Sequence, residues 1–180
     1  MTFQTPARIR VALARVVRVL VLPSLSCALV ACAGAPERQE QIDLDILVSA
    51  GPTINRDEMS RPAPVMVRLY ELKSAAIFDD ADFYTLQNDG KRLLGDDALT
   101  VDEFILRPGE RRHVHRLAHP GTTVIGVLAG YRVLDRSVWR TTYHLPSTPD
   151  VVWYRALVPR IKAKLTVDLG DRGVSVTELN

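Results

Sequence analysis

Apolar and polar side chains alternate in several short stretches of this 180-residue chain. In residues 42–48 the even-numbered positions are all apolar, and two of the intervening positions are aspartates. Alternation with a period of two is typical of a strand that buries one face. The same pattern returns in residues 161–169, where a Gly-Asp-Arg-Gly turn leads into residues 174–178. The chain is therefore predicted to end in a β-hairpin.

Further strands are predicted from runs rich in apolar, β-branched or aromatic residues and bounded by turn residues. They span residues 65–72, 102–106, 111–117, 122–131 and 139–145. Pro-Gly pairs at 108–109 and 120–121 suit the turns between three of them. The run 122–131 is almost wholly apolar and contains Gly126 and Gly130, which predicts a central strand that another part of the chain crosses closely.

The stretch 73–88 differs from these strands, because it lacks Gly and Pro and is rich in alanine and aromatic residues. It predicts one or two short helices, with Ser74 and Asp80 as caps and Asn88-Asp89-Gly90 as the end. About eight short strands with one helical insertion after the second strand predict an all-β fold with a small helical insertion. The expected architecture is a β-sandwich of two sheets.

A long polar segment joins the first two predicted strands. Residues 51–64 contain three prolines and four charged residues. A connection of this length is unusual inside a compact domain, and such loops are often functional. The prolines restrict the conformations of the free loop.

The first 31 residues have a composition of their own, with four arginines and no acidic residue. Their apolar run, Val19–Ala31, is shorter than the about 20 residues that a membrane-spanning helix needs. Leu29-Val30-Ala31-Cys32 is typical of a lipobox, which predicts cleavage between Ala31 and Cys32 and acylation of the Cys32 thiol. The alternative is an ordinary signal peptide cut near Ala33, with Cys32 an incidental thiol.

Removal of residues 1–31 as a lipoprotein signal peptide changes the charge of the protein. The 23 basic residues fall to 19 while the 21 acidic residues remain, so the net charge becomes −2 in place of +2. A nucleic-acid surface would require a clustered basic excess, and none is predicted. We predict that residues 32–40 form the lipidated N-terminus and a tether. Residues 41–180 are predicted to form a single β-sandwich domain.

Candidate chemistry is sparse. His113 and His115 emerge on one face of a predicted strand, with His119 nearby, and could bind a metal. The alternative is a polar outward face among several arginines, since no acidic residue lies within residues 111–119. The pairs Asp79-Asp80 and Asp96-Asp97 are interpreted as helix caps and solvated turns. No nucleophile elbow or phosphate loop is present. We therefore predict neither a catalytic site nor a metal site.

The two tryptophans, Trp139 and Trp153, are the largest aromatic side chains of the chain. Each could belong to the core or serve as an exposed interface anchor, and the small number of aromatic residues favours the core.

Five short motifs follow one another behind the lipobox. They are RPAPVMVRLYELK at 61–73, the segment Phe78 to Leu86 containing ADFY, LRPGE at 106–110, GVLAGYR at 126–132, and Trp139-Arg140. In this order they resemble the TssJ family of outer-membrane lipoproteins of the type VI secretion system, also called SciN or VasD. The resemblance covers about residues 26–179, lipobox included.

This resemblance implies a transthyretin-like two-sheet β-sandwich with a helical insertion after the second strand. Members of the family are not enzymes. They anchor the trans-envelope membrane complex to the outer membrane by binding the periplasmic C-terminal domain of the inner-membrane protein TssM. Their contact surface includes the loop between the first two strands, which here is the segment 51–64.

The loop supplies the expected partner-binding residues of this chain. They are Pro52, Thr53, Ile54, Asn55, Arg56, Asp57, Glu58 and Met59. Two of them, Ile54 and Met59, could either serve as apolar anchors or tuck under the sandwich. The polar and charged residues between them could set the register of the complex.

The expected location is the periplasmic face of the outer membrane. Covalent diacylglycerol and an N-acyl chain at Cys32 would insert into the inner leaflet of the outer membrane. An aspartate after the lipidated cysteine retains lipoproteins at the inner membrane, and position 33 of this chain is an alanine instead. We expect no cofactor besides these acyl chains, no nucleic acid and no small-molecule substrate. A periplasmic β-sandwich lipoprotein that binds a sugar or a peptidoglycan fragment is the alternative function, and a metal-dependent hydrolase comes third.

Overall fold

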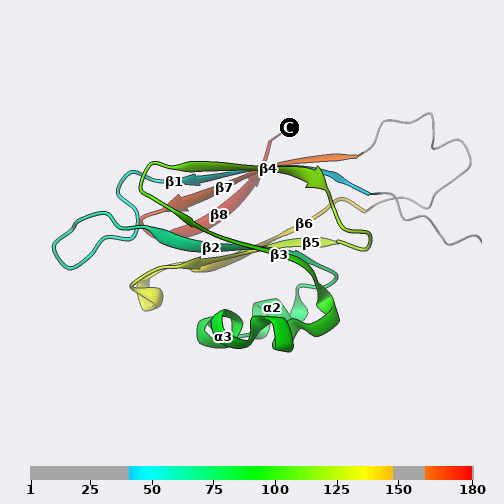
Figure 1. Cartoon of the computed structure of the whole chain (residues 1–180), viewed down its shortest axis with the longest axis horizontal. Coiled ribbons are helices and arrows are strands. Elements are labelled where there is room, and N and C mark those ends of the chain that lie inside the picture. Colours follow the sequence, from blue (N-terminus) through cyan, green and yellow to red (C-terminus); the bar gives the residue numbers. More distant parts are fainter. Residues whose placement is uncertain (1–40, 148–160, 180) are drawn as a thin grey trace, which may run out of the picture. The chain divides into compact units, whose positions relative to one another are not determined.

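Eight strands form two four-stranded sheets that pack face to face (Figure 1). The computed structural model describes residues 41–147 and 161–179, all within one compact unit, Gln39–Asn180. The predicted signal peptide, the lipobox with Ala31 and Cys32, the tether and Trp153 lie outside the described residues. The strands are β1 (Asp43–Ala50), β2 (Val65–Leu72), β3 (Ala98–Leu106), β4 (Arg111–Leu117), β5 (Val124–Gly130), β6 (Arg140–His144), β7 (Lys162–Gly170) and β8 (Gly173–Glu178).

One sheet has the strand order β4-β1-β7-β8 and the other has the order β3-β2-β5-β6. All pairings inside the two sheets are antiparallel except that of β1 with β7. Two short helices, α2 (Ala76–Asp80) and α3 (Phe83–Leu94), follow β2 and lie on the outer face of its sheet (Figure 1). The predicted eight-stranded sandwich with a helical insertion after the second strand is confirmed.

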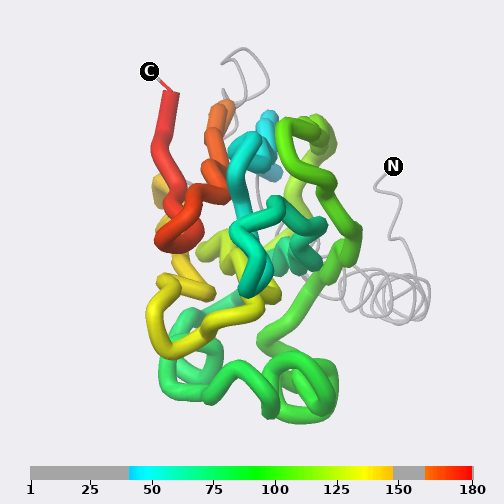
Figure 2. Tube along the Cα trace, turned by 90° about the vertical axis from the view of Figure 1, so that its left-hand side faces the viewer, coloured from blue at the N-terminus to red at the C-terminus, as the bar shows by residue number. Residues whose placement is uncertain are grey.

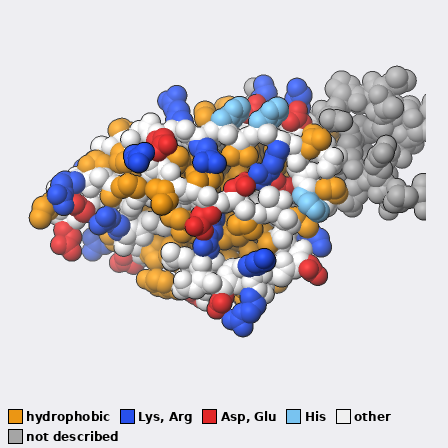
Figure 3. All heavy atoms as spheres, viewed as in Figure 1, with side chains coloured by type: hydrophobic (Ala, Val, Ile, Leu, Met, Phe, Trp, Pro, Cys, Tyr) orange, Lys and Arg blue, Asp and Glu red, His pale blue; other side chains and the backbone are white. Residues whose placement is uncertain are grey.

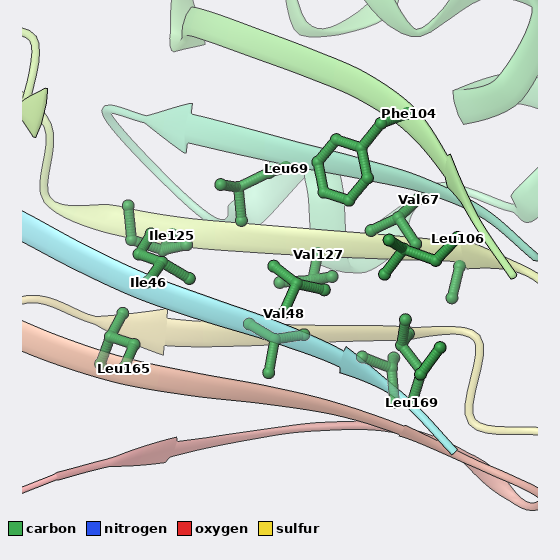
Figure 4. Packing of buried hydrophobic residues seen from close by; sticks show 14 of the residues in the cluster. Ile46, Val48, Val67, Leu69, Phe104, Leu106, Ile125, Val127, Leu165 and Leu169 are labelled. Atoms are coloured by element: carbon green, nitrogen blue, oxygen red, sulfur yellow. The ribbon is translucent and has the colours of Figure 1, made fainter. Parts of the chain in front are cut away.

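The core between the sheets is built from the inward positions of the alternating strands (Figure 4). Ile46 and Val48 of β1 and Leu165 of β7 face Val67 of β2 and Val127 of β5, and each is at most 1% exposed. Burying one such side chain stabilises the fold by about 1.5–3 kcal/mol. The period-two pattern of the sequence therefore correctly predicts which face of these alternating strands is buried.

A second apolar cluster lies between the helices and the outer face of the β2–β5 sheet. Strand β5 is consequently buried on both faces, which explains its continuous apolar run. Its Gly126 is the predicted point of close crossing: a Cβ there would lie 3.2 Å from the ring of Phe78 on α2 and 3.1 Å from Leu72. The Phe78 ring also packs on Tyr70, with ring centroids 5.2 Å apart.

Two arginines fasten the helical insertion to the sheet beneath it. The Arg68 side chain donates to the main-chain carbonyls of Leu86 and Gln87, at 3.0 and 2.7 Å. The Arg140 side chain donates to the carbonyls of Phe78, at 3.0 Å, and Ala81. Both arginines stand in motifs singled out in the sequence, and their role is to satisfy carbonyls near the ends of α2 and within α3.

The tryptophan beside Arg140 also connects the insertion to the sandwich. Trp139 is half-buried, packs against both apolar clusters and meets the Phe83 ring edge-on, with centroids 5.4 Å apart. This packing supports the core interpretation of Trp139.

The predicted boundaries of the insertion are wrong in two places. The cap of α3 is Asp82, whose side chain accepts from the Thr85 amide at 3.0 Å, whereas Asp80 is the last residue of α2. The helix also continues through Gly90 to Leu94, because buried Gly90 packs beneath the Tyr70 hydroxyl, where a Cβ would come within 3.5 Å. Tertiary packing here outweighs the weak helix propensity of glycine.

The two sheets are tied together by a buried carboxylate at the end of the sandwich where β2 finishes. Glu71 is 1% exposed and accepts from the Arg116 side chain at 2.7 Å, the His119 amide at 2.6 Å and the Thr122 hydroxyl at 3.1 Å. Arg116 also pairs with Asp102 of β3 at 2.6 Å. The buried charge is therefore neutralised and hydrogen-bonded, as a charge in this position must be.

Candidate partner-binding surface

The loop 51–64 lies at the end of the sandwich opposite to the start of β1, together with three shorter connections (Figures 1 and 2). These are the β3–β4 turn, the β5–β6 connection with its short 3₁₀ helix η3 (Leu134–Arg136), and the β7–β8 turn. The base of the loop is fixed, since the Gly51 amide donates to the Leu169 carbonyl at 2.8 Å and the Gly109 amide donates to the Ala50 carbonyl at 3.1 Å.

Within the loop, Asp57 organises a tight turn. Its carboxylate accepts from the amides of Met59 and Arg61, both at 2.9 Å, and from the Arg61 guanidinium at 2.8 Å. These bonds, first among them the Arg61 amide, lower the pKa of Asp57. An ionised carboxylate therefore holds the tip of the loop at neutral pH.

Two residues of the loop belong to the folded core. Ile54 is fully buried in the apolar cluster between the sheets. Asn55 is 8% exposed: its amide nitrogen donates to the Pro64 carbonyl at 2.6 Å, and its side-chain oxygen accepts from the Arg132 amide at 2.8 Å. Asn55 has a φ of 55°, a left-handed conformation that asparagine tolerates better than most residues.

A polar cluster joins the loop to the β7–β8 turn. The Thr53 hydroxyl donates to the Asp171 carboxylate at 2.9 Å, and the Arg56 guanidinium lies 3.5 Å from the same carboxylate. Arg56 also donates to the Thr53 carbonyl at 3.2 Å. The loop is therefore braced on both sides, which reduces the entropy that docking would cost.

These contacts divide the eight expected partner-binding residues into two groups. Pro52, Arg56, Glu58 and Met59 are exposed, and Met59 is 75% exposed. The apolar-anchor alternative for Ile54 is wrong in this structure, because its side chain fills the core. Buried Asn55 and half-buried Thr53 and Asp57 shape the loop from within, so no more than part of each could face a partner.

A cleft of about 440 Å³ opens beside the loop. Its lining residues are Asn55, Arg56, Tyr131, Arg132, Val133, Arg136, Ser137 and Asp171. Burial raises the pKa of Tyr131, and the neighbouring Asp171 carboxylate adds to this, so the phenol stays neutral and donates to the Gly170 carbonyl at 3.1 Å. Three arginines against one aspartate make this cleft basic.

Exposed apolar side chains gather near the cleft. Val133 is 46% exposed and Val138 is 58% exposed. The loop and the β5–β6 connection are separated by about 75 residues in the sequence, and the Asn55–Arg132 hydrogen bond joins them. Local pattern alone does not bring these segments together. The sequence singled out Asn55 and Arg56 in the loop, and Tyr131 and Arg132 at the end of the GVLAGYR motif, but it did not place them in one cleft.

A second cleft, of about 500 Å³, lies between α3 and β3 and includes Arg68, Gln87 and Thr100. Its one aromatic lining residue is Tyr70, which is 2% exposed. Neither this cleft nor the basic cleft, both within the described residues, presents the exposed aromatic rings expected of a sugar site.

The histidine cluster is paired with carboxylates across the β1–β4 ladder, on the top of the molecule in Figure 3. His113 contacts Asp45, and the His115 imidazole lies 3.0 Å from the Asp43 carboxylate. Residues 111–119 contain no acidic residue, but the strand register brings both aspartates of β1 beside the histidines. Among the described residues no group suited to a metal ion occurs, and His119 bonds the Pro120 carbonyl instead.

None of the described helices is long and apolar enough to cross a membrane. The acidic pair Asp79-Asp80 lies in the last residues of α2, and Asp96-Asp97 lies in the 3₁₀ turn η2 (Gly95–Asp97), as the interpretation as helix termini and turns requires.

The braced loop and the basic cleft share one end of the β-sandwich. Loops that a rigid scaffold holds in this way often carry the binding residues of a protein. The model of a family described as type VI secretion lipoproteins, including VasD, EvfM and TssJ, matches residues 42–172. The chain therefore belongs to the type VI secretion lipoprotein family, and the resemblance noted in the sequence is confirmed. This is a family of structural secretion-system lipoproteins and not a family of enzymes.

Solved structures agree with this assignment. The crystal structure of the lipoprotein TssJ1 from Pseudomonas aeruginosa is 31% identical, covers 78% of this chain and 98% of its own, and superposes with a TM-score of 0.68. Serratia marcescens Lip, described as a membrane-bound component of the type VI secretion system, is 30% identical, covers 75% and 96%, and has a TM-score of 0.64. A chain of a structure described as a type VI membrane complex shares the fold, at 22% identity, coverage of 79% and 100%, and a TM-score of 0.59. No curated protein matches the chain.

Proposed function

We propose that this protein anchors the membrane complex of the type VI secretion system to the outer membrane by binding the periplasmic C-terminal domain of TssM. Acyl chains at Cys32 hold the inner leaflet, residues 33–40 give slack, and the exposed residues of loop 51–64 contact the partner. The observation that carries this proposal is the position of the braced, exposed loop at the opposite end of β1 from the tether's point of attachment.

That position suits a mechanical link. The tether precedes β1 and the loop follows it, so tension between membrane and partner runs along β1 itself. Eight residues of strand, at about 3.3 Å each, span about 26 Å and are already almost fully extended. β1 also lies inside its sheet, hydrogen-bonded to β4 and β7 on its two sides. Tension along β1 can lengthen the strand very little, which favours transmission of the force to the partner.

The strength of the proposed membrane anchor depends on the number of acyl chains at Cys32. Each buried CH₂ contributes about 0.8 kcal/mol of membrane affinity, and one chain alone binds only marginally, whereas a lipoprotein cysteine carries two or three chains. Replacing Cys32 by Ser is expected to leave partner binding intact while the protein leaves the outer-membrane fraction and secretion stops. Retention of the Cys32→Ser variant in that fraction would contradict the proposed anchor.

Partner binding is tested by co-purification of residues 33–180 with the periplasmic C-terminal domain of TssM from the same bacterium. We expect a stable complex. Absence of a complex, with a domain that shows a cooperative thermal transition, would contradict the proposed function. Deletion of residues 52–60 is a poor test, because it also removes buried Ile54 and Asn55 and would damage the fold.

A further inference from the structure

We propose that the basic cleft beside the loop is a carboxylate-binding site that receives an acidic side chain of the partner, as a second contact outside loop 51–64. This inference rests on the proposed function, because the partner supplies the carboxylate. Its residues come from the β5–β6 connection and the β7–β8 turn as well as from the loop, and the end of the sandwich that they form faces the viewer in Figure 2.

The walls of the cleft are fixed by hydrogen bonds. Asn55 on the loop side accepts from the Arg132 amide at 2.8 Å, which joins the loop to the β5–β6 connection. On the other side, the main chain of Val138 is bridged to Gly173, where an added Cβ would lie 2.5 Å from the Val138 side chain. The Ser137 hydroxyl closes η3 by donating to the Val133 carbonyl at 2.8 Å. A cleft with such walls exists before a ligand arrives.

The charge of the cleft is incompletely neutralised. Arg56 is paired with Asp171 at 3.5 Å, and both Asp171 oxygens are also within bonding distance of the Thr53 hydroxyl, at 2.9 and 3.1 Å. Arg132 and Arg136, by contrast, are exposed and form no ion pair with any carboxylate of the part of the chain that the structure describes. Two guanidinium groups are thus available to an anion from outside.

The chemistry of these groups selects a carboxylate. A guanidinium presents parallel N–H donors that match the two oxygens of a carboxylate, and it is weakly hydrated, so it is suited to interfaces. Val133, at 46% exposure, lines the same cleft and can pack on the methylene groups of a glutamate or aspartate. An inorganic anion would meet the arginines but would gain nothing from Val133.

The test uses the full-length lipoprotein purified in detergent and the periplasmic C-terminal domain of TssM. Dissociation constants are measured for the wild type, for Arg132→Glu/Arg136→Glu, and for Lys73→Glu/Lys91→Glu. The control pair produces the same change of charge at exposed positions outside the basic cleft. Arg132→Lys/Arg136→Lys preserves the charge while it removes the forked donors, and thermal midpoints of all variants check that they fold.

We expect Arg132→Glu/Arg136→Glu to bind about 100-fold more weakly than the wild type, because the loss of each arginine contact with an interfacial charge costs roughly tenfold or more in affinity. The control pair should bind less than about threefold more weakly than the wild type. Arg132→Lys/Arg136→Lys should bind about tenfold more weakly than the wild type, because it keeps the charge and loses the forked donors. Wild-type affinity should also fall with salt more steeply than that of the charge-reversed variant. Equal affinity of the charge-reversed and control variants would overturn the carboxylate site while leaving the proposed function intact.

Two further outcomes are decisive. Failure of the wild type and the control pair to bind would overturn the proposed function and the carboxylate site with it. Competition by phosphate at constant ionic strength, with no difference between the variants in partner binding, would assign the cleft to a free anion and also overturn the proposal.

Discussion

Replacing Asn55 by Ala should loosen the end of the sandwich that carries loop 51–64. The side chain is 8% exposed and joins two segments, through the Pro64 carbonyl at 2.6 Å and the Arg132 amide at 2.8 Å. Alanine removes both hydrogen bonds and also occupies a φ of 55° at a cost, because its Cβ disfavours the left-handed region. Glycine at the same position removes the hydrogen bonds without that backbone penalty.

The expected magnitude follows from these two contributions. Each hydrogen bond contributes about 0.5–1.5 kcal/mol net, and the left-handed backbone costs alanine about 1 kcal/mol. Asn55→Ala should therefore lower the free energy of unfolding by about 2–4 kcal/mol, and Asn55→Gly by about 1–3 kcal/mol. The first loss is a large part of the about 5–15 kcal/mol by which domains of this kind are stable.

Urea-induced unfolding of residues 33–180 measures the free energy, with an unchanged m-value as the sign that the two-state transition is preserved. Amide hydrogen exchange adds a local measurement. The Arg132 amide should exchange about tenfold faster for each 1.4 kcal/mol lost, while amides at the far end of β2 change only through global stability. Unfolding free energies within about 0.5 kcal/mol of wild type, with an unchanged Arg132 exchange rate, would refute the bracing role of Asn55.

Three further predictions concern the scaffold and the loop. Glu71→Ala should lower the free energy of unfolding, measured in urea, by about 2–4 kcal/mol, because it removes the buried acceptor shared by the Arg116 side chain, the His119 amide and the Thr122 hydroxyl; a loss under about 1 kcal/mol would contradict the network. Gly126→Val should cost about 1–3 kcal/mol, since its side chain must displace Phe78. In a double-mutant cycle this cost should be smaller in a Phe78→Ala background than in the wild type, because the smaller side chain leaves room for the valine. The lowered pKa of Asp57 means that its stabilising contribution is present above the ordinary carboxyl value of 3.8 and is lost as the pH falls through the lower folded value. Loop amides should therefore exchange faster below that pH, after correction for intrinsic rates, and Asp57→Asn should remove this acid dependence.

The positions of most strands could be predicted from the sequence, whereas the arrangement of the candidate surface could be predicted only in part. Strands β1, β2 and β4 were placed almost residue by residue, because alternation and flanking turn residues are both local properties. The N-cap of α3 was predicted at the wrong residue. Asp79, Asp80 and Asp82 are all aspartates that could cap a helix, and only the backbone conformation shows that Asp82 is the cap. The early start of β3 at Ala98 was missed because residues 98–101 do not alternate clearly between apolar and polar positions.

The candidate surface needed the three-dimensional structure for a different reason. Both alternatives for Ile54 and Met59 were compatible with the sequence, and packing placed the first in the core and left the second exposed. Arg132 and Arg136, which form no ion pair within residues 41–147 and 161–179, lie beside the loop only in the folded chain. The pairing of His113 with Asp45 likewise depends on the register of two strands that are about 70 residues apart in the sequence.

Titration calorimetry of one loop variant tests whether the exposed side chains of loop 51–64 bind TssM. The variant Arg56→Ala/Glu58→Ala/Met59→Ala removes three exposed side chains and leaves buried Ile54 and Asn55 in place. Its matched control, Lys91→Ala/Asp96→Ala/Tyr84→Ala, removes a cation, an acid and a large apolar side chain near the helical insertion. We expect the loop variant to lose at least about 2 kcal/mol of binding free energy to the periplasmic C-terminal domain of TssM, while the control binds like wild type. Equal affinities of the two variants, both folded, would show that the loop is not the binding surface.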